Sequence, residues 1–82
     1  RYGGDEFLLM FEEIPEKVFQ QKLEDIREEI AMADVPEYKE IRLSMSVGGV
    51  YGSCKVRDGV MEADRLLYQA KRQKNCVAYK RI

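Results

Sequence analysis

The feature that most constrains the fold is a pair of glycines followed by two carboxylates and a run of apolar residues. Gly3 and Gly4 favour a tight turn, because glycine has no Cβ and reaches positive φ without steric cost. The apolar run after them predicts a strand over residues 7–12, buried on both faces of a sheet. Asp5 and Glu6 lie at the lip of the turn, where hard oxygen atoms suit a divalent cation beside a nucleotide triphosphate. An ordinary hairpin turn with solvated acidic residues is the commoner interpretation of such a string taken alone.

Two amphipathic segments predict helices that cover the sheet. The first spans residues 15–32, where Pro15 suits the first turn and Glu16 favours the positive end of the helix dipole. The second spans residues 59–73, with Asp58 as its expected cap. The apolar stripe of the first helix consists of Val18, Phe19, Leu23, Ile26 and Ile30, and that of the second of Val60, Met61, Ala63, Leu66, Leu67 and Ala70. A core-facing stripe is the default interpretation, and a partner-binding face is the alternative for the first.

Two more strands complete the expected element order β-α-β-α-β. Residues 40–51 alternate apolar and polar side chains, which predicts a strand with period two. Gly48 and Gly49 interrupt this strand, and glycine inside a strand marks a bulge or a close approach by other atoms. Residues 76–80 predict a last short strand.

Composition excludes several classes of function. The chain has 82 residues, enough for one small domain or a piece of one, and its net charge of -1 gives no basic surface for nucleic acid. No apolar run is long enough to cross a bilayer, so we expect no membrane contact by this segment. The absence of histidine excludes His-based triads and argues against zinc. Cys54 and Cys76 are expected to be reduced thiols, with a disulfide as the alternative.

Three stretches together resemble one known family. Residues 3–7 read Gly-Gly-Asp-Glu-Phe, residues 46–48 read Ser-Val-Gly, and residues 63–71 read Ala-Asp-Arg-Leu-Leu-Tyr-Gln-Ala-Lys. In this order they resemble the signatures of GGDEF domains, the bacterial diguanylate cyclases. The resemblance implies an α+β fold, similar to the polymerase palm and the nucleotidyl cyclases, with helices on a ferredoxin-like, antiparallel-rich sheet.

The resemblance also implies roles for individual residues. Gly3 and Gly4 would let a nucleotide lie close to the backbone. Asp5 and Glu6 would serve both metal binding and catalysis, with the two roles undivided between them. Lys71 would contact phosphate groups as a point charge.

The end of the second helix departs from the family pattern. Many members carry a glycine and a basic residue shortly after the lysine, whereas this chain has Arg72-Gln73-Lys74-Asn75. Lys74 is the nearest candidate for a second phosphate contact, and Asn75 is expected to end the helix in the left-handed conformation. The simpler interpretation is that these cations, Lys71 included, complement the helix dipole.

Phe7 is expected to anchor the core.

As a GGDEF domain the protein would condense two GTP molecules into cyclic di-GMP and pyrophosphate in the cytoplasm. It would use Mg²⁺ or Mn²⁺ once the domain is complete, and two domains would meet as a homodimer. Because the signature stands at residues 3–7, we expect residues 1–82 to be the C-terminal half of the domain and to be inactive alone.

In the family fold, a strand that would precede residue 1 lies between the strands expected at 7–12 and 40–51. Without that strand, we expect these two strands to pair directly, or copies of the chain to associate through their open strand edges. The alternative functions are a non-catalytic GGDEF domain that binds GTP or cyclic di-GMP as a receptor module, and a ferredoxin-like interaction domain with a chance motif.

Overall fold

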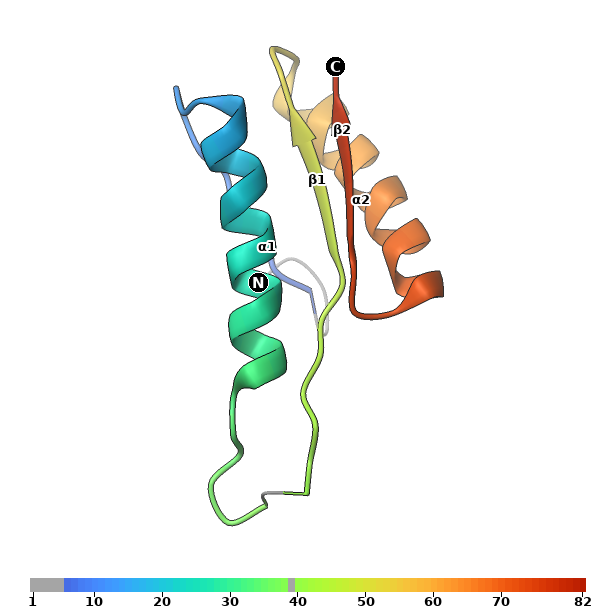
Figure 1. Cartoon of the computed structure of the whole chain (residues 1–82). Helices are drawn as coiled ribbons and strands as arrows, with labels where there is room; N and C mark the ends of the chain where they lie inside the picture. The colour runs from blue at the N-terminus through green and yellow to red at the C-terminus, as the bar shows by residue number, and fades with distance from the viewer. Residues whose placement is uncertain (1–5, 39) are drawn as a thin grey trace.

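The chain folds as an α+β structure with two helices and two strands in the order α-β-α-β (Figure 1). The computed structural model describes residues 6–38 and 40–82. Its elements are α1 (Glu16–Met32), β1 (Val47–Tyr51), α2 (Val56–Gln73) and β2 (Val77–Arg81). The expected order β-α-β-α-β is therefore wrong in its first element.

The two strands are parallel neighbours joined through α2. Their register runs from Val47 opposite Val77 to Tyr51 opposite Arg81. A parallel pair needs a crossover connection, and α2 provides it. The resemblance implied an antiparallel-rich sheet, whereas the pair that the structure describes is parallel.

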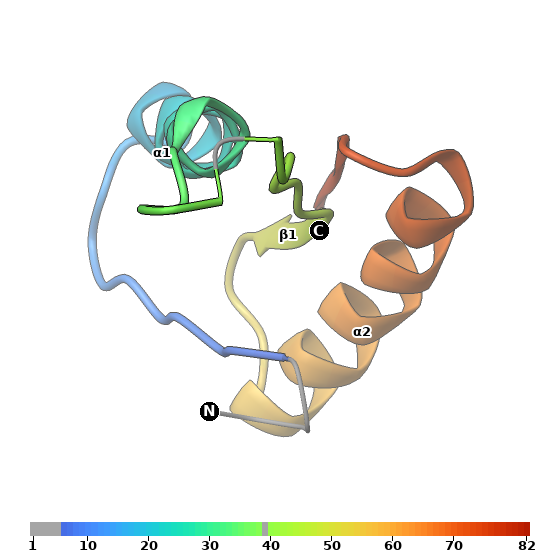
Figure 2. The same ribbon diagram turned by 90° about the horizontal axis from the view of Figure 1, so that it is seen from below.

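The helices lie on opposite faces of β1, and two adjacent glycines mark those faces. A Cβ on Gly48 would meet the backbone of α2 at Ala63 and Leu67. A Cβ on Gly49 would meet the side chain of Leu23 on α1. Since successive residues of a strand face opposite sides, each glycine lets one helix approach closely (Figure 2).

The helix starts follow backbone geometry more than side-chain caps. Pro15 is the N-cap of α1, and its carbonyl accepts the Phe19 N–H at 3.0 Å. The second helix begins at Val56, earlier than expected, because the Lys55 carbonyl already accepts the Gly59 N–H at 2.9 Å. Asp58 is therefore in the first turn, where it favours the dipole, and is not the cap.

The core is small and lies between the helices and the strands. Its buried apolar side chains are Phe19, Leu23, Leu66 and Ala70. Phe19 is the centre of an aromatic cluster, with ring centroids 5.6 Å from Tyr51, 6.1 Å from Tyr79 and 6.0 Å from Phe11. The stripes predicted for both helices thus include every core residue, although Val18, Ile30 and Met61 remain exposed.

The strand predicted over 7–12 does not form. Among the described residues, no strand pairs with this segment, and Phe7 is 73% exposed, so it does not anchor the core. A strand needs a neighbour for its backbone N–H and C=O groups, and apolar composition alone does not supply one. Direct pairing of 7–12 with 40–51 is therefore wrong as well.

The second predicted strand is shorter than its alternating pattern. It was expected over 40–51 and forms only from Val47, because its partner β2 begins at the opposite residue, Val77. The last strand was expected over 76–80 and lies one residue later.

Cys54 and Cys76 are free thiols, as expected. Neither described helix has the length and apolar character needed to cross a membrane.

Candidate functional site

The structure brings together two of the predicted site residues from opposite ends of the chain. Lys71 Nζ donates to the Glu6 carboxylate at 3.0 Å, across a sequence separation of 65 residues. The Glu6 side chain is 25% exposed and the Lys71 side chain 46% exposed, so both heads are partly accessible to a ligand. Sequence analysis assigned both residues to one site but did not predict that they contact each other.

Each partner reaches this position from a different kind of segment. Lys71 lies in the last turn of α2, on a helix whose Leu66 and Ala70 are buried against the strands. Glu6 precedes the segment that leads to α1, and Figure 2 shows this segment passing around the side of β1 that the two helices leave open. The predicted residues Gly3, Gly4 and Asp5 lie outside the described residues.

Lys74 lies at the end of α2 and has a structural role there. It is the C-cap residue with φ 62°, and its N–H donates to the Ala70 carbonyl at 2.9 Å. Asn75 follows with φ 48°, so two residues with positive φ reverse the chain where one was expected. The Asn75 side chain also accepts a hydrogen bond from Arg27 of α1 at 3.3 Å. Lys74 is exposed, which leaves its head group accessible to solvent.

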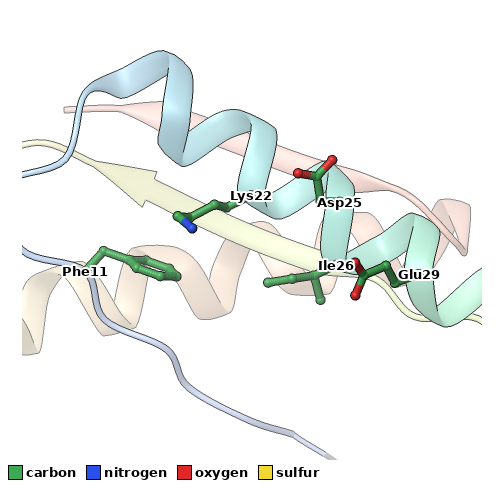
Figure 3. A pocket seen from close by; sticks show the side chains of 5 residues that line it. All are labelled: Phe11, Lys22, Asp25, Ile26 and Glu29. Carbon is green, nitrogen blue, oxygen red and sulfur yellow. The ribbon is translucent and has the colours of Figure 1, made fainter.

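A groove on another part of the surface contains none of the predicted site residues. Phe11 lies beside Lys22, Asp25, Ile26 and Glu29 of α1, and together they line a hollow of about 330 Å³ (Figure 3). The Lys22 ammonium lies 5.8 Å from the centre of the Phe11 ring, a cation–π contact that holds this segment on α1. The groove is thus a feature of packing between the segment and α1, separate from the pair at Lys71.

The Glu6 carboxylate is the type of group that binds a hard divalent cation. Glu6 presents a partly accessible carboxylate, and carboxylate oxygens are the ligands that Mg²⁺ and Mn²⁺ prefer. Within residues 6–38 and 40–82, no group of three acidic, cysteine or histidine side chains forms a complete cation site.

Comparison with known families identifies the chain. The family model described as "Diguanylate cyclase, GGDEF domain" matches residues 1–76, nearly the whole sequence. Comparison with curated proteins and with solved structures gave no significant match. The match includes all three stretches singled out above and both members of the Glu6–Lys71 pair. This chain belongs to the GGDEF family.

Proposed function

We propose that the chain carries the signature half of a diguanylate cyclase domain, which condenses two GTP molecules into cyclic di-GMP and pyrophosphate. Family membership and the intact residues 3–7 support this proposal. The observation that carries it is the 3.0 Å contact between Glu6 and Lys71. A partly exposed ion pair contributes only about 0–1 kcal/mol to stability. The contact supports the proposal because it joins one residue of the stretch at 3–7 to one residue of the stretch at 63–71, both within the family match.

The proposed chemistry needs both charges. The 3′-oxygen of each GTP ribose attacks the α-phosphorus of the other GTP, so two new P–O bonds form, two bonds to pyrophosphate break, and two pyrophosphates leave. The hydroxyl must lose a proton, and Asp5 or Glu6 is the proposed group that takes it. The leaving pyrophosphate gains negative charge, and Lys71 is the proposed cation beside it, with Lys74 as a second. In the structure Lys71 Nζ contacts the Glu6 carboxylate at 3.0 Å.

Asp5 and Glu6 are also the proposed ligands of Mg²⁺ or Mn²⁺, consistent with the carboxylate that Glu6 presents. A bound divalent ion would lower the pKa of the attacking hydroxyl and neutralise phosphate charge. A cation bound by Glu6 would compete with Lys71 for this carboxylate.

We further propose that the active unit is larger than this chain. In that unit a complete domain holds one GTP, a second domain presents the other, and the enzyme works in the cytoplasm. Purified residues 1–82 incubated with GTP and magnesium should therefore form no cyclic di-GMP. Product above a blank without protein would overturn this part of the proposal.

The decisive test is GTP turnover by the full-length protein that contains this chain. Glu6→Gln keeps the size of the side chain and removes its charge, and turnover should fall at least a hundredfold, as on removing a general base. Lys71→Ala should weaken GTP binding, whereas Lys17→Ala, which removes an exposed lysine of α1, is the matched control and should leave it unchanged. Binding of GTP or cyclic di-GMP without turnover in the wild type would instead indicate a receptor module.

A further inference from the structure

The carbonyl of Ala70, the residue before Lys71, accepts three hydrogen bonds. The Lys74 N–H donates at 2.9 Å as part of the helix end. The Ser46 hydroxyl donates at 3.3 Å, and the Cys76 thiol donates at 3.3 Å. Ala70 itself is 1% exposed, so these bonds form at the most buried point of α2.

The sheet register explains why two side chains reach one carbonyl. Ser46 and Cys76 directly precede the register pair Val47 and Val77, and the Val47 N–H donates to the Cys76 carbonyl at 3.0 Å. Residues paired across parallel strands point to the same face of the sheet. That face is the one on which α2 packs, as Gly48 shows two residues after Ser46.

We propose that Ser46 and Cys76 are positioning residues that set Lys71 opposite Glu6. The carbonyl of Ala70 and the N–H and Cα of Lys71 belong to one peptide plane, so holding the carbonyl also holds the backbone position from which the Lys71 side chain leaves the helix. The Lys74 N–H alone satisfies this carbonyl as a helix end requires. The two side-chain donors are therefore additional restraints on the last turn of α2.

A long lysine side chain near a helix end is positioned more precisely when the backbone below it is restrained. Lys71 is 46% exposed, and a long exposed side chain samples many rotamers unless its base is held. Each neutral hydrogen bond changes an equilibrium by about 2- to 10-fold. The part of this inference that concerns phosphate binding rests on the proposed function, whereas the part that concerns the Glu6–Lys71 pair does not.

The first test measures the pair without any nucleotide. The full-length protein is labelled with an amine-reactive reagent, and the rate at each lysine is followed by peptide mass spectrometry. Ser46→Ala and Cys76→Ala should each raise the rate at Lys71 by about 2- to 10-fold. Lys80, which pairs with Glu62 at 3.4 Å, is the internal control and should keep its rate, which also shows that the variant is folded.

Two further variants separate positioning from general packing. Cys76→Ser keeps a donor at the same place and should bring the Lys71 rate back toward that of the wild type. Cys54→Ala removes an exposed thiol away from Ala70 and should change nothing. A Lys71 rate unchanged in both alanine variants, or a rise shared equally by Lys80, would overturn the inference.

The second test is a double-mutant cycle for GTP affinity in the same protein. Ser46→Ala should weaken GTP binding severalfold when Lys71 is present and have no further effect in the Lys71→Ala background. Equal weakening in both backgrounds would contradict a role through Lys71. If the labelling result holds and the wild type binds no GTP, the positioning role stands and the proposed function fails. If the wild type converts GTP to cyclic di-GMP and labelling is unchanged in the variants, the proposed function stands and the positioning role fails.

Discussion

Replacing Gly48 by alanine should separate α2 from β1, because this glycine is where the helix lies on the strand. An added Cβ would lie 2.8 Å from the Leu67 Cα and closer still to the Leu67 nitrogen and the Ala63 oxygen. Ordinary contact begins at 3.4 Å, so the Leu67 nitrogen, one of the two closest atoms, must move by about 1 Å. All three atoms belong to the helix backbone, so no side chain can rotate away to relieve the contact.

The expected cost follows from that rigidity. Forcing extra methyl groups into a packed interior costs about 1–3 kcal/mol, and backbone neighbours place this change at the upper end, about 2–3 kcal/mol. For a domain of this size that loss lowers the melting temperature by roughly 8–24 °C. Thermal unfolding followed by far-ultraviolet circular dichroism measures it directly.

Two other glycines provide matched controls. Gly49→Ala meets the end of the Leu23 side chain, which can rotate, so it should cost less than the change at Gly48. Gly59→Ala lies inside α2 and meets only the Cys54 sulfur, at 3.1 Å, so the gain in helix propensity of about 0.5–1 kcal/mol should make it neutral or stabilising. A Gly48→Ala variant as stable as the wild type would refute the close packing inferred here.

Three further outcomes can be measured. Burial and the hydrogen bond to Glu16 raise the pKa of Tyr79 to about 12, above its unfolded value of 10.0. The neutral Tyr79 side chain therefore stabilises the fold fully below pH 10, and this contribution is lost as pH rises through 12. The ultraviolet absorbance titration of the wild type minus that of Tyr79→Phe gives this pKa. The hydrogen bond from Arg65 lowers the pKa of Glu62 below 4.5. The Glu62–Arg65 pair therefore stabilises the fold above pH 4.5, and this contribution is lost as pH falls through the lowered pKa. In an NMR titration, the Glu62 pKa should be higher in Arg65→Gln than in the wild type. Lys71→Ala should weaken the binding of GTP much more than that of guanosine, measured by calorimetry, and equal weakening would argue against a phosphate contact.

The helices could be predicted from sequence because their signals are local. The apolar spacing around Phe19 and Leu23 and around Leu66 and Ala70 gave both helices and all the core residues. Their ends were less certain, because the α2 start depends on a backbone bond from Gly59 and not on a side-chain cap.

The strands could not be predicted with the same success because a strand depends on its partner. Residues 7–12 have strand composition but no neighbour among the described residues, and residues 40–46 lose theirs because β2 begins only at Val77. The composition of a segment indicates its preference for strand structure, whereas the length of the strand that forms depends on the partner segment with which it pairs.

For the site, sequence identified residue types but not contacts. The family motifs pointed to Glu6 and Lys71, and the structure places them 3.0 Å apart. The sequence alone could not show that Ser46 and Cys76 share the Ala70 carbonyl, because that contact depends on strand register. The one available signal was the Ser-Val-Gly stretch at 46–48, whose serine has the same parity as Gly48 and so faces α2.

The continuous β1–α2–β2 unit has a consequence for how the chain opens. Its three elements follow one another in sequence and pack on one another directly, whereas α1 is connected to them through the long segment that Figure 1 shows extending below the sheet. Contacts between neighbouring stretches of chain close short loops and form a cooperative unit. The amides of α2 should therefore exchange with deuterium last, and those of α1 should exchange earlier, in a partial opening that leaves the parallel pair intact.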